Sequence, residues 1–500
     1  MHRPNVLFLI WDACRYDAAV SHASNLRRLG ESNLWFENAI APSTWSLPSH
    51  AALFSGRYPS ELGVLRAGER VDAPPLVSDL SARGYRTHGV SGNSFFSPSH
   101  GFDAPFDEFT YTTLLRYAEG MDVSELYDLF AARDPGVTGL LGVGASAARR
   151  LVAHDYPIQS AVNLATASIQ VLSSGPFPQL NAVPHPVFND YTLFSYTPEK
   201  NTRLVKSAIE RRDDDRPFFV VANYMDTHRP YLPPERYQRE FLGRTLSYRE
   251  SESLNKDLAD FWEHQTRLAA GDVADDELAD LRGLYAGEVR SVDDHLGELL
   301  SHLERCGELD DTLVVVTADH GENLGELDEM GRVRMGHEAS VSEHLLRVPL
   351  VVAHPALDAR RVTEYVNIKD LYGLLTRDLE PFLASGGAEL GSLVPDDGIV
   401  VVEHPAKGPL DFRSRYPGVP EDVATRVQSE NAAAGYLDGW KVVLTDDDSW
   451  AWLDGETRPV SDAPERLVDA CARHLSSLGR EDDDELSDDA IRHLEDLGYL

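Results

Sequence analysis

The chain has 500 residues, enough for one large domain with a smaller companion, and it is strongly acidic, with 82 aspartates and glutamates against 46 lysines and arginines and a formal net charge of −36. This charge argues against a nucleic-acid binder and against docking on anionic lipid, because both need clustered basic side chains. A hydrophobic content of 42% and an aromatic content of 9% exclude a disordered chain.

The basic residues are mostly arginines, since the chain has only six lysines. A surface rich in carboxylates and poor in lysine stays hydrated in molar salt, where the Debye length is about 3 Å and self-repulsion is screened. We therefore expect a salt-adapted protein of haloarchaeal type; an ordinary acidic protein is the alternative.

The three cysteines, Cys14, Cys306 and Cys471, form neither a disulfide framework nor a metal-type pair in the sequence. An apolar run begins at Asn5, which leaves too few residues before it for a signal sequence. No apolar run reaches the roughly 18 residues that a membrane span needs. We expect a cytoplasmic protein without a transmembrane segment.

Short apolar runs alternate with helical segments along the chain, which predicts an α/β fold with a mostly parallel central sheet flanked by helices. Apolar residues spaced by three and four positions from Leu281 to Leu303, with Gly307 after them, predict a helix and its end. The predicted strands of the sheet cover residues 6–10, 87–90, 218–222, 313–317 and 348–352.

The domain organisation is predicted from changes in composition. We expect a catalytic domain over residues 1–385, with a helical and loop insertion of unassigned role at about 110–200. For residues 386–500 we predict a small α+β subdomain. Apolar runs near 436–444 and 449–453 predict antiparallel strands in it, joined by acidic turns. Its acidic tail predicts a solvated helix.

Polar residues follow several predicted strands directly, where an open α/β sheet binds its ligands. Asp12 follows the first strand, although a carboxylate there also suits a helix cap. Asp319 and His320 follow the strand at 313–317 and offer adjacent oxygen and nitrogen ligands for a divalent ion. His228, after the strand at 218–222, suits a general acid or a histidine held in a proline-rich turn.

A further candidate is the serine-containing segment of residues 41–57, a loop that we expect to enter a helix at residues 49–53. A hydroxyl at a helix N-terminus lies where backbone N–H groups stabilise an anion, but an N-cap serine in a turn is the alternative. Arg57 follows this helix, and His337 lies farther along in the stretch Gly336-His-Glu.

The order and strand context of these segments resemble the sulfatase family of the alkaline-phosphatase superfamily over about residues 4–380. The features that match are the strand before Asp12, Ser46-x-Pro-Ser, Gly84-Tyr-x-Thr, a Phe-Phe strand ending near His228-x-Pro-Tyr, Asp319-His-Gly and Arg347-Val-Pro.

The resemblance implies a nucleophile at Ser46 and one divalent metal ion held by Asp12, Asp319, His320 and the Ser46 oxygen. A bound dication would lower the pKa of the serine hydroxyl and take up charge on the transferred group.

The resemblance further implies that His228 and His337 contact the ester and protonate the leaving group. Arg57 matches a basic residue of the family that follows the nucleophile helix. A structural role for Arg57, as the partner of a carboxylate, is an equal alternative to a role in the active site.

Three departures from the family pattern bear on the substrate and the metal. His50 replaces the arginine that accompanies formylglycine, which makes formylglycine at Ser46 unlikely and favours an unmodified serine. Asn93 stands where many arylsulfatases have a lysine and a histidine that grip the sulfate, so we expect its amide to donate a neutral hydrogen bond to the substrate. An asparagine at this place resembles the phosphonate and phosphodiester hydrolases of the superfamily. The pair Asp12-Ala13 lacks a carboxylate of the usual calcium site, which with the added imidazole of His320 favours Mn²⁺ or Zn²⁺ over Ca²⁺.

We therefore expect a metal-dependent hydrolase that cleaves a sulfate or phosphate ester through a covalent intermediate on Ser46. The substrate is an anionic ester, such as a sulfated or phosphorylated glycan, a lipid precursor or a small molecule. A phosphodiester or phosphonate monoester hydrolase is one alternative, and a phosphoglycerol- or phosphoethanolamine-type transferase is another. A binding protein that kept the fold without catalysis is a third alternative. Assembly into a homo-oligomer is also left open by the sequence.

Overall fold

The computed structural model describes residues 3–66, 68–112, 198–211, 216–247, 271–337, 340–406 and 430–479, with a few single positions between 151 and 267. Residues Met1–Thr110 and Asn201–Leu500 belong to one compact unit and Tyr111–Lys200 to another. The first unit carries everything discussed below. The predicted insertion and the predicted acidic tail lie almost wholly outside the described residues.

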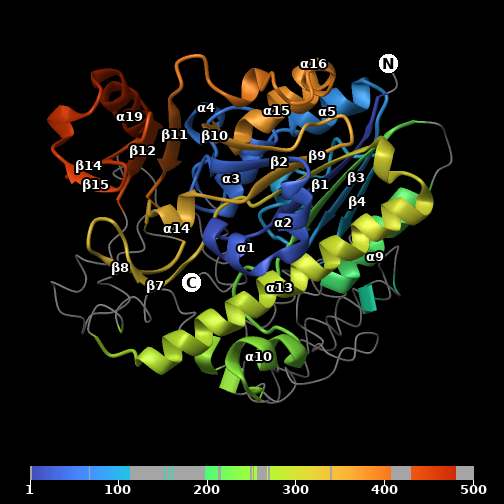
Figure 1. Cartoon of the computed structure of the whole chain (residues 1–500), viewed down its shortest axis with the longest axis horizontal. Helices are drawn as coiled ribbons and strands as arrows, with labels where there is room; N and C mark the ends of the chain where they lie inside the picture. The colour runs from blue at the N-terminus through green and yellow to red at the C-terminus, as the bar shows by residue number, and fades with distance from the viewer. Residues whose placement is uncertain are drawn as a thin grey trace. The chain divides into compact units, whose positions relative to one another are not determined.

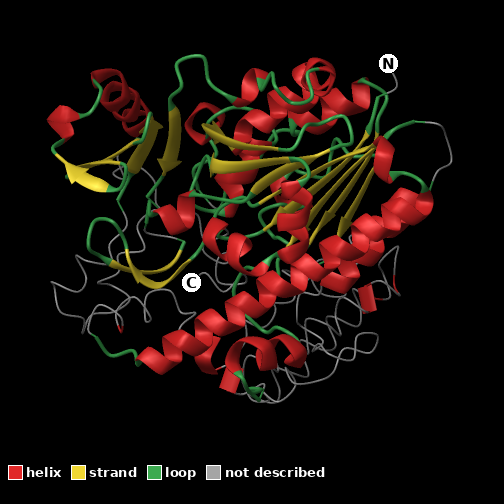
Figure 2. Cartoon of the chain, viewed as in Figure 1, coloured by secondary structure: helices red, strands yellow, loops and turns green. Residues whose placement is uncertain are grey.

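An eight-stranded sheet forms the centre of the first unit, in the order β10-β2-β9-β6-β1-β5-β3-β4 (Figures 1 and 2). β1 pairs in parallel with β5 and β6, and β3 pairs in parallel with β5. β9 runs antiparallel to both of its neighbours, β2 and β6. The predicted mostly parallel sheet is thus confirmed. Its strands are β1 (Asn5–Trp11), β2 (Leu34–Ile40), β3 (Arg86–Ser91), β4 (Glu108–Tyr111), β5 (Phe218–Tyr224), β6 (Thr312–Thr317), β9 (Leu350–Ala353) and β10 (Arg360–Asn367).

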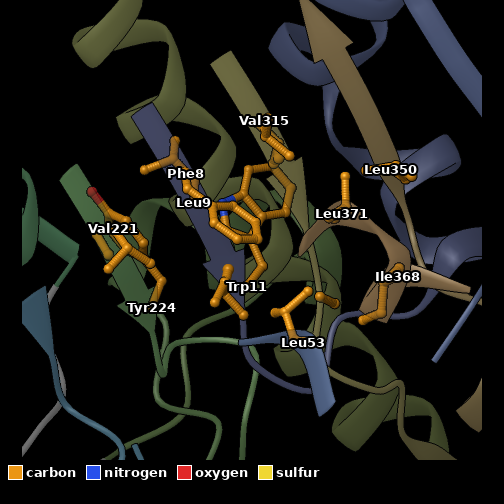
Figure 3. Close-up of a cluster of buried hydrophobic side chains, with 14 of the residues drawn as sticks. Phe8, Leu9, Trp11, Leu53, Val221, Tyr224, Val315, Leu350, Ile368 and Leu371 are labelled. Atoms are coloured by element: carbon orange, nitrogen blue, oxygen red, sulfur yellow. The ribbon is translucent and has the colours of Figure 1, made fainter. Parts of the chain in front are cut away.

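The three central strands β5, β1 and β6 are buried at every position, because helices cover both faces of the sheet. This is why their sequences are continuous apolar runs with no polar alternation. Figure 3 shows part of the resulting core, where side chains of these strands lie with Leu53, Ile368 and Leu371. Burial of each such side chain contributes about 1.5–3 kcal/mol, so the central strands are held firmly in place.

The long helix α13 (Asp275–Cys306) packs against α1 and α2 on one side of the sheet, and α5, α15 and α16 lie on the other (Figure 1). α13 ends where Gly307 adopts a positive φ of 73°, as the sequence predicts. None of the described helices is both long and apolar enough to cross a membrane. The other helices are α1 (Tyr16–His22), α2 (Ser24–Glu31), α3 (Ser46–Leu53), α4 (Pro59–Leu62), α5 (Pro75–Ala82), α9 (Pro198–Glu210), α10 (Glu235–Leu242), α14 (Glu343–Leu346), α15 (Leu371–Gly373), α16 (Leu379–Ala384) and α19 (Glu465–Ser477).

A second sheet of five antiparallel strands, β11 to β15, forms the C-terminal part and packs against α19. The predicted antiparallel C-terminal strands are therefore confirmed. A third, two-stranded sheet consists of β7 and β8. These strands are β7 (Asn323–Leu327), β8 (Val333–Gly336), β11 (Val400–His404), β12 (Ala432–Leu437), β13 (Trp440–Thr445), β14 (Ser449–Leu453) and β15 (Glu456–Arg458).

Strand β11 also contacts the loop before α3. Ser43 forms a β-bridge with Glu403 and donates its hydroxyl to the Glu403 carbonyl at 2.7 Å. The hydroxyl of Thr44 lies 2.5 Å from Nδ1 of His404. The Glu403 carboxylate, which is fully buried, accepts hydrogen bonds from Ser60 and contacts His474 of α19 at 2.7 Å.

Candidate active site

The carboxyl ends of β5, β1 and β6 meet at one edge of the sheet, because the three strands are parallel neighbours in register. Ile10 of β1 is paired with Asn223 on one side and with Thr317 on the other. Asp12 follows β1 directly, and Asp319 stands two residues beyond β6. Side chains from three strands are therefore gathered at this edge, and Asp12, Asn223 and Asp319 are all fully buried.

Asp12, Asp319 and His320 bring three candidate ligand atoms within 4.8 Å of one another. Oδ1 of Asp12 and Oδ2 of Asp319 are buried and accept no hydrogen bond. Burial, and then the nearby Asp319 carboxylate, raise the pKa of Asp12. Two adjacent buried carboxylates with unsatisfied oxygens are costly alone, whereas a divalent cation between them would remove the repulsion. The residues thus fit the metal that the family implies.

His320 is prepared to act as a ligand through its Nε2 atom. Nδ1 lies 2.8 Å from the carbonyl oxygen of Gly321 and donates to it, which leaves the lone pair on Nε2. Burial lowers the pKa of His320 to about 4, so the ring is neutral near pH 7. Gly321 is needed here, because a Cβ atom would lie 2.0 Å from the carbonyl oxygen of His344.

Ser46 is the first residue of α3, so the helix begins three residues earlier than the sequence predicts. Pro48 does not prevent this, because proline is tolerated in the first turn, where its missing N–H has no partner to lose. The Ser46 side chain is 1% exposed, and its Oγ lies 3.2 Å from Nε2 of His320. The hydroxyl therefore lies beside the proposed ligand atoms.

Two asparagines hold the Asp12 carboxylate. The side-chain amides of Asn93 and Asn223 both donate to its Oδ2 atom, the latter at 3.1 Å. Asn93 was expected to donate to the substrate, and the structure instead directs its amide to Asp12. We did not single out Asn223 from the sequence; its only signal is a polar side chain near the end of an otherwise apolar strand.

His50 fixes the start of α3. Its Nδ1 donates to the carbonyl oxygen of Ser46 at 2.7 Å, and its Nε2 lies 3.2 Å from the Asn223 amide. The ring stacks on Phe96 with the centroids 5.1 Å apart and the planes 9° from parallel. The imidazole that replaces the family's arginine thus supports the backbone of Ser46.

His337 and His228 lie at the other side of His320. The ring centroid of His337 is 4.6 Å from that of His320 and 5.1 Å from that of His228. Nδ1 of His337 lies 3.2 and 3.3 Å from the two carboxylate oxygens of Glu322. A histidine paired with a buried carboxylate resembles the arrangement that orients an acid–base histidine in hydrolases.

Glu322 is the second residue that sequence reasoning missed, although it stands within the stretch Asp319-His-Gly-Glu. Its carboxylate is fully buried and accepts a hydrogen bond from the Tyr231 hydroxyl at 3.2 Å. Nε of Arg229 lies 3.9 Å away. Only the fold shows that this carboxylate reaches His337, because the two residues are joined by the β7–β8 hairpin.

Arg57 is not brought into this cluster by any described contact. Its guanidinium donates to the carbonyl oxygen of Glu61 at 2.6 Å, and its backbone N–H donates to Ser55. These contacts favour a structural role for Arg57 over a role in the active site. The described partner of its guanidinium is a backbone carbonyl and not the carboxylate that the sequence suggested.

A model of the sulfatase family matches residues 4–375 of the chain. The chain belongs to the sulfatase family. The match covers all eight strands of the central sheet and every residue of the cluster described above, and family enzymes are metal-dependent hydrolases. The chain is accordingly a sulfate or phosphate ester hydrolase.

Two curated relatives match this family member over about three quarters of their own length. The N-acetylglucosamine-6-O-sulfatase of Bacteroides thetaiotaomicron is 22% identical over 82% of this chain and 73% of its own. Arylsulfatase K of Danio rerio is 23% identical over 88% of this chain and 77% of its own. Both names describe enzymes that act on sulfate esters.

Solved structures share the fold at lower identity. The phosphonate monoester hydrolase of Agrobacterium radiobacter has a TM-score of 0.59 and 19% identity, with 95% of each chain covered. That of Silicibacter pomeroyi has a TM-score of 0.57 and 20% identity, with 99% of this chain and 96% of the other covered. These likenesses confirm the alkaline-phosphatase-like architecture.

Proposed function

We propose that this enzyme hydrolyses a monoanionic ester, either a sulfate monoester or its phosphorus counterpart, a phosphodiester or phosphonate monoester, with Ser46 as the nucleophile. The observation that carries this is the position of the Ser46 hydroxyl, at the start of α3 and 3.2 Å from His320 within the carboxylate cluster. An unmodified serine at this place has the geometry of a covalent nucleophile.

The charge of the cluster supports a substrate with one negative charge. Asp12, Asp319, His320 and Ser46 would hold the metal, and a divalent ion is offset by the two carboxylates. Asn93 and Asn223, which hold Asp12, are neutral amides. A cluster of zero net charge accommodates a monoanion with less electrostatic cost than the dianion of a phosphate monoester.

In the first chemical step, Ser46 has lost its hydroxyl proton to solvent, and its Oγ attacks sulfur or phosphorus while the bond to the leaving oxygen breaks. When bound, the divalent ion lowers the pKa of the serine hydroxyl and offsets charge on the transferred group. Ser46 is the first residue of α3, and the N-terminus of a helix favours negative charge that develops close to it.

His337 donates a proton to the leaving oxygen, because Glu322 stabilises its protonated form and fixes the orientation of the ring. The ring centroid of His228 lies 5.1 Å from that of His337, which supports the proposed role of His228 in contacting the non-bridging oxygens of the ester. In the second step, His337 takes a proton from water, which attacks the ester on Ser46 and releases the product.

The experiment compares the wild-type chain with Ser46→Ala after loading with Mn²⁺ or Zn²⁺. The panel contains an aryl sulfate, a diaryl phosphate, an aryl phosphonate monoester and an aryl phosphate monoester. We expect turnover of at least one of the first three, little of the last, and loss of all turnover in Ser46→Ala. Ser55→Ala, which removes a hydroxyl just beyond α3, serves as the control and should keep activity.

Two results would overturn the proposal. Turnover that persists in Ser46→Ala would exclude the serine nucleophile. A peptide containing Ser46 with a mass lower by two hydrogens would show formylglycine and not serine. If an added alcohol captures the group in place of water, the transferase alternative is favoured.

A further inference from the structure

A second group of metal-ligating side chains lies where α9 and α13 end. His302 and Cys306 are one turn apart on α13, and Glu210 is the last residue of α9. The two helices end side by side (Figure 1), and Nε2 of His302 lies 3.5 Å from Oε1 of Glu210. Both helices end shortly before β5 and β6 begin, so this group lies at the amino edge of the sheet, opposite the active site.

The spacing of the three candidate atoms matches a tetrahedral zinc site. Sγ of Cys306 lies 3.6 Å from Nε2 of His302, and all three ligand atoms lie within 4.8 Å of one another. With Zn–S and Zn–N bonds of about 2.3 and 2.05 Å, tetrahedral angles separate sulfur and nitrogen by about 3.6 Å. The same calculation gives a distance of about 3.4 Å between a nitrogen and a carboxylate oxygen that bind one zinc ion.

The chemistry of the three side chains also favours zinc. Thiolate, imidazole and carboxylate are all ligands that Zn²⁺ accepts, and a soft sulfur ligand disfavours Mg²⁺ and Ca²⁺. Cys306 is a free, exposed cysteine, so an ion can reach it from solvent. Lys206, the nearby lysine, is paired with Glu298.

We propose that Glu210, His302 and Cys306 bind one Zn²⁺ ion, with water in the fourth position. The ion links the end of α9 to the last turn of α13, across 92 positions of the sequence from Glu210 to His302. Its role is structural, since it is separated from Ser46 by the length of the strands. The site does not depend on the ester chemistry proposed above.

Cobalt substitution tests this site separately from the catalytic one. The full-length chain is stripped with chelator under reducing conditions and titrated with Co²⁺. Thiolate coordination produces a charge-transfer band in the near ultraviolet, which the Asp12–Asp319–His320 cluster does not produce because it lacks sulfur. We expect the band in wild type and in Asp319→Asn, and its loss in Cys306→Ser. Glu304→Ala, a change of an exposed carboxylate beside the site, should leave it intact.

Zinc affinity gives a second measurement, made in the Asp319→Asn background. Loss of a residue that only orients a ligand costs about 10- to 100-fold in affinity, so loss of a direct ligand by Cys306→Ser should cost at least as much. Glu210→Gln should lower the affinity less and keep the cobalt band. Absence of the band in wild type, or an unchanged band and zinc affinity in Cys306→Ser, would overturn the proposal.

Discussion

Replacement of Glu322 with glutamine tests whether His337 is the proton donor to the leaving group. Glutamine keeps the size of the side chain and removes its charge. The carboxylate lies 3.2 and 3.3 Å from Nδ1 of His337 and is fully buried. A hydrogen bond to a charged group contributes about 1.5–3 kcal/mol, which corresponds to about a 10- to 150-fold loss in the step that needs the imidazolium.

The assay compares two leaving groups on the substrate class that the enzyme turns over. An alkyl ester needs protonation of its leaving oxygen, so its kcat should fall by the full factor in Glu322→Gln. A nitrophenyl ester leaves without a proton, so its kcat should change much less. Glu326→Gln, in the same hairpin but paired with Arg15, is the matched control. Equal losses for both esters would refute the role given to His337.

Four further outcomes are expected. Asp319→Asn should abolish activity and metal binding at the active site yet stabilise the metal-free protein by about 1 kcal/mol in thermal unfolding, because it removes the repulsion with Asp12. Asn93→Ala should weaken metal binding by about 10- to 100-fold in a titration, whereas a substrate-binding role would change KM alone. Lys441→Met should cost about 2–3 kcal/mol in urea unfolding, because it leaves the carboxylates of Glu343 and Glu329 without their cationic partner. Turnover should rise with salt toward molar concentrations, because the net charge of −36 repels an anionic ester in dilute buffer; a maximum in dilute buffer would contradict salt adaptation.

The pair of Lys441 and Glu343 also gives a pH dependence with a definite sign. Burial alone would raise the pKa of Glu343, but Lys441 and the Tyr436 hydroxyl lower it below its usual value. Because the folded value is below the unfolded one, the pair stabilises the protein at neutral pH. The stabilisation is lost as the pH falls from about 4.5, the usual pKa of a glutamate, through the lower pKa of the folded state, and Lys441→Met should lack this part of the acid sensitivity.

The centre of the sheet was predictable from sequence because β1, β5 and β6 are buried on both faces, whereas β2, β4 and β10, which are partly exposed, were not predicted. β1, β5 and β6 are therefore uninterrupted apolar runs, and the polar residue that ends each run marks the edge where ligands bind. Asp12, Asp319 and His320 were found in this way. The antiparallel direction of β9 was not predictable, since a buried strand has the same composition in either direction.

The residues that were missed act through long-range contacts. Glu322 and His337 are fifteen positions apart and meet through a hairpin, while Asn223 reaches Asp12 because β5 lies next to β1 in register. No local periodicity encodes such contacts. The role of Asn93 was predicted for the substrate because sequence shows that an amide is present near the site, but not which acceptor its N–H groups reach.

The contact between β11 and the loop before α3 has a consequence for chimeras. A chain that ends at residue 385 would retain Asp12, Ser46, Asp319 and His320 and still lack the strand that fixes Ser43 and Thr44, the residues just before the nucleophile. We expect an exchange of the C-terminal sheet between relatives to disturb Ser46, unless the loop before α3 is exchanged together with β11. The position of Ser46 therefore depends on a strand that lies more than 350 positions away in the sequence.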